Sequence, residues 1–339
     1  MEERTDYLAI LNSLHETPVR DRNSHILILD GLNTFLRAFS VIKTVNPKGH
    51  NVGGIAGFLR SLGSLKRQFN PSRIVVVWDG KGGSTNRKHL NANYKAQRVH
   101  AAVIHWDLYD SKEEEAQSIH DQAARLEEYL ECLPVTYLKV DKLEADDIIA
   151  FLAQSADRAG NKTTIVSTDR DFLQLVSKNI QVYNPVKKVI YDQKETFSYL
   201  GILPDNYNLV KALVGDSSDN IEGIRGAGLK TVASLFPELK EDPTCTLQYI
   251  YDTCSKNLGQ KKLYAKILTE WNRVEQNFKI MDLQESVLDE SEKSFVLTEA
   301  RRPVGKVQIG KFLALLEQDY ISEITANTEG WLLDFSNLS

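Results

Sequence analysis

Aspartate residues stand at the ends of three predicted strands in this chain. The stretches HILILD, RIVVVWD and KTTIVSTD end at Asp30, Asp79 and Asp169, and Asp171 follows two residues later. A single aspartate after a strand is usually a turn former. Three of them favour one shared acidic site, because the carboxyl ends of parallel strands lie at one edge of a sheet and ligands bind beyond that edge.

A second acidic cluster opens the predicted helix KLEADDIIAFLAQ, residues 142–154, with Glu144, Asp146 and Asp147. Acids in a first turn interact well with the helix dipole, which accounts for one or two of them. A third is unfavourable, since like charges about 4 Å apart repel by about 4 kcal/mol at an effective dielectric near 20. Glu144 and Asp147 share a helix face, and we expect a distorted first turn to bring Asp146 to the same cation.

With Asp216 and Asp219 in GDSSDN, nine carboxylates are candidates for one site. Such a set would raise its own pKa values and destabilise the fold unless cations compensate it. Mg²⁺ prefers oxygen ligands and combines carboxylates with water and phosphate. Two metal ions about 3.5 to 4 Å apart suit an in-line displacement at phosphorus. The acids therefore predict metal-dependent phosphodiester hydrolysis.

The basic residues are unevenly distributed. The net charge is -5, so the chain without these nine acids carries +4. Residues 81–98 contain five Lys or Arg side chains and no acid. Taken alone, this run is either a solvated loop or a nucleic-acid surface.

Several other classes of site are disfavoured. The three cysteines are odd in number and widely spread, which argues against a disulfide framework or a zinc site. GIRGAGLKT resembles a P-loop, but Leu229 separates Gly228 from Lys230. No apolar run reaches the roughly 20 residues of a membrane helix, and the first 24 residues are too polar for a signal peptide. We expect a cytoplasmic protein without membrane contact.

Strand and helix patterns alternate up to about residue 200, which predicts an α/β fold with a parallel sheet. Helices are expected over 54–69, 114–133 and 142–154, and a short one over 3–14. Beyond residue 200 we expect a helix, an acidic loop, a Gly-rich turn and a second helix over 204–236, then helices over 246–257 and 260–281. From about residue 285 the chain is expected to be less regular.

Six motifs together resemble those of the structure-specific 5′-nucleases, the flap endonuclease and 5′-3′ exonuclease family. They are ILDGLN, VVWDG, NYKAQR, EADDIIA, STDRDFLQL and GDSSDNIEGIRGAGLKT, in that order between about residues 25 and 235. The chain is most similar to free-standing phage members of the ribonuclease H type found in T-even bacteriophages. The resemblance implies a PIN-like α/β fold, with a central, mainly parallel sheet flanked by helices, a helical arch and a helix-three-turn-helix region.

The resemblance also implies a domain organisation. It gives an extension over 1–24, a catalytic domain over 25–204 with an arch at about 81–118, a helical DNA-binding region over 205–290 and a C-terminal segment over 291–339. The C-terminal GWLLDFSNLS is either an ordinary packed end or a peptide similar to those that dock on sliding clamps.

Residue roles are carried over from the family motifs. The first metal group is Asp30, Asp79, Glu144, Asp146 and Asp147, and the second is Asp169, Asp171, Asp216 and Asp219. Catalytic cations are Lys95, Arg98 and Arg37. Nucleic-acid contacts are Tyr94, Arg87, Lys88, Gly223, Arg225, Gly226, Gly228, Lys230 and Thr231.

The implied activity is removal of RNA primers and 5′ flaps during replication, leaving 5′-phosphate products. Two Mg²⁺ ions, replaceable by Mn²⁺, are the implied cofactors, with K⁺ at the Gly-rich turn. The implied partners of a monomeric enzyme are branched or flapped DNA, RNA·DNA hybrid, a sliding clamp and a single-strand DNA-binding protein. The alternatives are a non-catalytic nucleic-acid-binding relative, disfavoured because no acid is missing, and a small-molecule phosphatase, which leaves the basic segment without a purpose.

Overall fold

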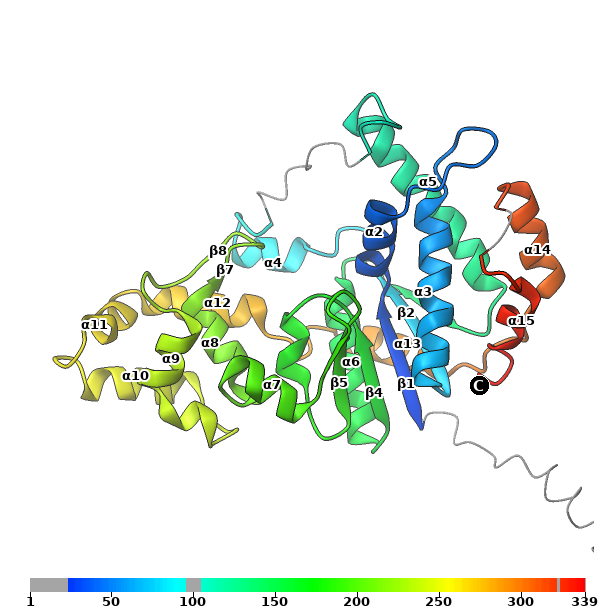
Figure 1. The fold of residues 1–339 in the computed structure, drawn as a ribbon. Coiled ribbons are helices and arrows are strands. Elements are labelled where there is room, and N and C mark those ends of the chain that lie inside the picture. Colours follow the sequence, from blue (N-terminus) through cyan, green and yellow to red (C-terminus); the bar gives the residue numbers. More distant parts are fainter. Residues whose placement is uncertain (1–23, 96–104, 322–323, 339) are drawn as a thin grey trace, which may run out of the picture.

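The computed structural model describes residues 24–95, 105–321 and 324–338, and its centre is a six-stranded sheet of order β3-β2-β1-β4-β5-β6 (Figure 1). Strands β1 to β5 run parallel, and β6 pairs antiparallel with β5. The mainly parallel sheet is therefore confirmed. The strands are β1 (His25–Asp30), β2 (Arg73–Trp78), β3 (Thr136–Lys139), β4 (Lys162–Val166), β5 (Ile180–Asn184) and β6 (Val189–Tyr191).

Hydrophobic cores cover both faces of this sheet. Successive strand side chains point to opposite faces, so Leu27 and Leu29 enter one core and Ile28 enters the other. The first core is closed by α2 (Gly31–Val41), α3 (Gly53–Phe69), α5 (Lys112–Glu131), α14 (Ile309–Gln318) and α15 (Thr328–Leu333). The second is closed by α6 (Ala145–Arg158), α13 (Glu290–Arg301) and the helices that follow residue 200.

Residues 193–281 form a mainly helical group beside the sheet, at the left of Figure 1. A short hairpin of two antiparallel two-residue strands lies within the group, and in it Asp216 pairs with Ile221. The elements of this part are α7 (Gln193–Leu200), η2 (Pro204–Asn206), α8 (Tyr207–Val214), β7 (Gly215–Asp216), β8 (Ile221–Glu222), α9 (Leu229–Leu235), η3 (Pro237–Lys240), α10 (Leu247–Lys256), α11 (Lys262–Thr269) and α12 (Trp271–Met281). Two short helices precede it, α4 (Thr85–Leu90) and η1 (Asp171–Leu175).

The expectation of an irregular chain beyond residue 285 is wrong. Helix α13 begins with a capping box in which Asp289 and Glu292 satisfy each other's backbone N–H groups. Its end is held by the buried Arg73, whose Nη1 donates to the carbonyl oxygens of Ala300 (2.7 Å) and Arg302 (3.0 Å). The C-terminal segment is thereby attached to the six-stranded sheet.

The C-terminal peptide is part of the hydrophobic core. Trp331 is 2% exposed, and Leu332 and Phe335 are fully buried. Gly63 on α3 makes room for this packing, since a Cβ there would lie 1.8 Å from Nε1 of Trp331. The C-terminal peptide therefore packs as an ordinary end of the core, and docking on a sliding clamp stays a prediction.

Two expectations from the sequence concern a helix near the N-terminus and membrane-spanning helices. The predicted helix over 3–14 lies outside the described residues. Across the part of the chain that the structure does describe, every helix is too short or too polar to span a bilayer.

Candidate active site

Aspartates at the ends of β1 and β2 each hold the N-terminus of a helix. Asp30 caps α2 by accepting from the backbone N–H of Asn33 (3.1 Å), and its other oxygen accepts from Oγ of Ser167 (2.9 Å). Asp79 accepts from the backbone N–H of Ala145 (2.9 Å), the first residue of α6. The carboxyl edge of the sheet therefore holds the first turn of α6 against β2.

Three aspartates from different elements influence one another at this edge. Burial, with the charge of Asp79, raises the pKa of Asp30 to about 6 despite its hydrogen bonds. Burial and the charges of Asp169 and Asp30 raise the pKa of Asp146 well above its usual range. Asp30, Asp79, Asp146 and Asp169 are therefore electrostatic neighbours, and their assignment to one metal site stays a prediction.

The acids of the α6 cluster separate into two directions. Glu144 and Asp147 share one helix face, as predicted, and both accept from Arg87. Asp146 has other electrostatic neighbours, Asp169 and Asp30. No distortion is needed for this, because Glu144 is an extended N-cap and regular helix begins at Ala145.

Arg87 is a buried partner of these acids. Its guanidinium donates to Asp147 at 2.8 and 2.6 Å and also to Glu144, and its side chain is 10% exposed. Although burial lowers it, the charges of Asp147 and Glu144 raise the pKa of Arg87 above its usual value. The predicted contact of Arg87 with nucleic acid is not supported by this position, because its buried guanidinium is already paired with Glu144 and Asp147.

Lys95 and Tyr94 complete the surroundings of Glu144. Nζ of Lys95 donates to Oε1 of Glu144 at 2.6 Å, and the hydroxyl of Tyr94 donates to Oε2 at 3.3 Å. The Lys95 ammonium also lies 4.9 Å from the centre of the Tyr94 ring. A catalytic cation predicted from sequence is therefore held directly against a predicted metal ligand.

The second acidic group lines a cleft of about 550 Å³. Its lining includes Asp169, Asp171, Lys211 and Asp216. Nζ of Lys211 on α8 contacts Asp171 and lies 3.2 Å from Asp216, so one buried ammonium joins η1 to the β7–β8 hairpin. Burial, followed by the charge of Asp169, raises the pKa of Asp171 to about 7 although Lys211 opposes it. Asp219 is the remaining member, and its carbonyl oxygen accepts from the backbone N–H of Lys95 at 2.9 Å.

Arg37 occupies a neighbouring pocket of about 470 Å³ together with Asn184 and Lys187. Among the described residues its buried Nε has no hydrogen-bond partner. Asn33 and Thr168 line both this pocket and the acidic cleft, and Asn33 Nδ2 donates to Thr168 Oγ1 at 2.8 Å. These two residues are functional candidates that sequence reasoning missed, since neutral side chains after a strand give no charge signal.

The Gly-rich turn presents a surface separate from the acids. The side chains of Arg225, Lys230 and Thr231 are exposed. Gly226 has φ of 100°, a left-handed conformation that favours glycine, and Gly228 has open space around it. Gly223 is required by packing, because a Cβ there would lie 1.9 Å from the carbonyl oxygen of Val214.

Lys88 and Arg98 are the two remaining predicted residues. Lys88 is exposed on α4. Arg98 lies outside the described residues, so its predicted catalytic role remains a prediction.

The acidic edge fits divalent cations by its chemistry. Asp30, Asp146 and Asp171 all have raised pKa values because they are buried and, as a smaller effect, because other carboxylates lie near them. A bound cation would favour the ionised carboxylates. Within the described ranges, no group of three His, Cys, Asp or Glu side chains is close enough to hold a metal ion. Lys95 instead contacts Glu144, and Lys211 contacts Asp171 and Asp216, so a metal ion bound by these three acids would displace the ammonium groups.

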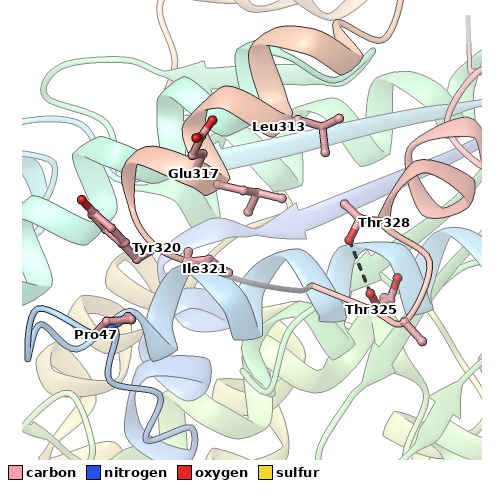
Figure 2. Close-up of a pocket in the computed structure, with 9 residues that line it drawn as sticks. Pro47, Leu313, Glu317, Tyr320, Ile321, Thr325 and Thr328 are labelled. Carbon is pink, nitrogen blue, oxygen red and sulfur yellow. Dashed lines mark hydrogen bonds between the residues drawn. The ribbon is translucent and has the colours of Figure 1, made fainter.

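An apolar pocket of about 610 Å³ lies elsewhere and involves none of these acids (Figure 2). It is formed by Leu313, Glu317, Tyr320 and the segment near Thr325, with Pro47 opposite. The Thr328 hydroxyl donates to the carbonyl oxygen of Thr325 at 3.4 Å (Figure 2). Glu317 is the charged residue of its lining, and none of the basic side chains or acids of the candidate site contributes to it.

A mainly parallel sheet with an acidic carboxyl edge, faced by basic side chains, defines an α/β nuclease. The profile of 5′-3′ exonuclease N-terminal, resolvase-like domains matches residues 25–201, and the chain belongs to the 5′-3′ exonuclease family. A 5′-3′ exonuclease of Aquifex aeolicus is 34% identical over 211 residues, which are 62% of this chain and 68% of that protein. DNA polymerase I of Rhizobium leguminosarum is 30% identical over 226 residues, which are 64% of this chain but 21% of the polymerase.

Solved structures support the fold. The flap endonuclease of bacteriophage T5, in a pseudo-enzyme–product complex with DNA and metal ions, has a TM-score of 0.62 at 17% identity, covering 87% of this chain and 99% of that one. The catalytic core of Rad2 with DNA substrate has a TM-score of 0.50 at 20% identity, covering 93% of each chain. The PIN-like α/β architecture with an added helical region is thus confirmed.

Proposed function

We propose that this nuclease uses two Mg²⁺ ions, replaceable by Mn²⁺, to cut phosphodiester bonds in 5′ DNA flaps and in RNA primers paired to DNA. The carrying observation is the junction of Asp30 on β1, Asp146 on α6 and Asp169 after β4, where burial and the charges of Asp169 and Asp30 raise the pKa of Asp146. The structural relatives solved with DNA and with metal ions support the same substrate and cofactor class.

The metal ions would supply an activated water and charge stabilisation at the phosphate. Asp30, Asp79 and Asp146 would hold the ions of the first group, and Asp169, Asp171 and Asp216 those of the second. Glu144 and Asp147 would act from behind them, because Arg87 occupies their oxygens.

The cations have a separate role on the substrate. Lys95, once released from Glu144, would contact the scissile phosphate, and Arg37 with its unpaired Nε would contact a neighbouring one. Donors aimed at developing charge typically contribute a factor of 10² to 10³ in rate. Arg98 is proposed to act with them.

The exposed Gly-rich turn would bind the duplex backbone, with K⁺ held by its carbonyl oxygens. Phosphate contacts of this kind orient a nucleic acid without reading its sequence. We propose the same domain boundaries as above, with monomeric action on branched DNA and RNA·DNA hybrid during replication, in the company of a single-strand DNA-binding protein.

The test is cleavage of 5′-labelled flap DNA and of a matched RNA·DNA hybrid by purified protein, with Mg²⁺ and with EDTA. We expect metal-dependent release of short 5′-labelled products from both substrates, and loss of turnover in Asp79→Asn with binding retained. Cleavage of DNA but not RNA would remove the primer-removal proposal alone. No metal-dependent cleavage of either substrate would refute the enzymatic proposal.

A further inference from the structure

The segment from Thr85 to Lys95 is attached to three separate parts of the protein. Arg87 contacts α6 through Glu144 and Asp147, and its Nε donates to the carbonyl oxygen of Ile280, near the end of α12, at 2.9 Å. The backbone N–H of Lys95 donates to Asp219, and Nδ2 of Asn220 donates to the carbonyl oxygen of Asn93 at 3.0 Å. This segment therefore joins the two acidic groups.

Arg87 is the buried centre of these attachments. Side-chain exposures are 10% for Arg87, 4% for Glu144 and 6% for Asp147. Buried charges are costly unless paired with good geometry, and the two parallel N–H···O bonds to Asp147 are the strong, orienting kind. A lysine could compensate the charge but could not reproduce this fork.

The same ion pairs set the rotation of the first turn of α6. Asp146 lies between Glu144 and Asp147 in the sequence, and successive helical residues are about 100° apart, so fixing those two on Arg87 places Asp146 on another side of the turn. Asp79 fixes the backbone of this turn through Ala145, but it does not contact the side chains that set its rotation.

We propose that Arg87 is a positioning residue that orients Asp146 for metal binding and couples that binding to the order of residues 85–95. The inference rests on the proposed metal site. Coupling is reciprocal, so a bound divalent ion should protect the backbone amides of this segment, and loss of Arg87 should weaken binding of the ion.

The sign of the metal effect distinguishes this role from simple charge compensation. Removing a cation beside carboxylates strengthens their attraction for a divalent ion if geometry is unchanged. A positioning role predicts the opposite result, because the carboxylates lose their arrangement. Affinity for metal is thus a readout that a purely electrostatic role would move in the other direction.

The experiment measures Mn²⁺ binding by calorimetry on the full chain without substrate, in wild type, Arg87→Gln and Arg87→Lys. We expect at least tenfold weaker binding for Arg87→Gln and a smaller loss for Arg87→Lys. Hydrogen exchange of amides 85–95 should slow with Mn²⁺ in wild type but not in Arg87→Gln. His89→Gln, an exposed neighbour on α4, is the matched control and should behave as wild type.

Arg87→Lys keeps the compensating charge and carries the test if Arg87→Gln does not fold. Mn²⁺ affinity equal to or tighter than wild type in a folded variant would overturn the positioning role. Absence of Mn²⁺ binding in wild type would instead refute the proposed metal site, so the two failures are distinguishable.

Discussion

Replacing Asp30 with asparagine should stabilise the protein when no metal is present. Burial raises the pKa of Asp30 from 3.8 to about 6, and one unit corresponds to about 1.4 kcal/mol. Keeping this carboxylate ionised above pH 7 therefore costs the folded state about 3 kcal/mol. Asparagine retains one acceptor oxygen but weakens the bonds from Asn33 and Ser167, at about 1 kcal/mol. The net expected gain is about 2 kcal/mol.

The direction of the pH dependence follows from the raised pKa. Between about pH 4 and pH 6 the folded state holds a proton on Asp30 that the unfolded state has released, so stability falls as pH rises through that window. Asp30→Asn lacks this titration. Its advantage should be close to 2 kcal/mol at pH 8 and should disappear near pH 4.

Urea unfolding in EDTA, at pH 4, 6 and 8, measures this effect. Asp252→Asn, on the exposed face of α10, is the matched control and should change stability by less than about 0.5 kcal/mol. Equal stability of Asp30→Asn and wild type at pH 8, with parallel pH profiles, would refute the reasoning that Asp30 is destabilised by burial and by its acidic neighbours.

Three further substitutions test other parts of the structure. Trp331→Ala should lower the free energy of unfolding by about 3 to 5 kcal/mol in urea, because the ring packs 4.8 Å from Phe335 in the core; an unchanged midpoint would show that the C-terminal peptide is not core. Lys211→Met should destabilise the metal-free protein by about 3 kcal/mol by leaving Asp171 and Asp216 without their shared ammonium, and Mn²⁺ should restore part of the loss in a thermal-shift assay; a stabilised variant would contradict this. Arg37→Ala should reduce single-turnover cleavage by at least tenfold with Mn²⁺ affinity unchanged, and full activity would remove Arg37 from the phosphate site.

The sheet was predictable where strands are buried on both faces. β1, β2 and β4 appear in the sequence as short aliphatic or β-branched runs, and each ends at, or within three residues of, the aspartate that marks it. β3, β5 and β6 were not predicted, because Thr136–Lys139 and Val189–Tyr191 are too short and mixed to give a periodic signal. α2 was also missed, since its N-cap Asp30 was interpreted as the end of a strand.

The site was predictable in its acids but not in their arrangement. Spacing showed that Glu144 and Asp147 share a face, yet it could not show that the face is directed to Arg87. That partner is 57 residues away from Glu144 in the sequence, and its contact depends on where α4 packs against α12. Lys211 was missed for a similar reason, because a lysine on a mostly apolar helix gives no sign that it will bridge two aspartates.

Our central proposal is that the strand-end acids and Asp146 form one divalent metal site. Calorimetric titration of the full chain with Mn²⁺ tests it directly, in wild type and in Asp146→Asn, with circular dichroism to verify folding. The account predicts two bound ions per chain in wild type and loss of at least one in the variant. Identical binding curves for the two proteins, or no binding by wild type at millimolar Mn²⁺, would contradict it.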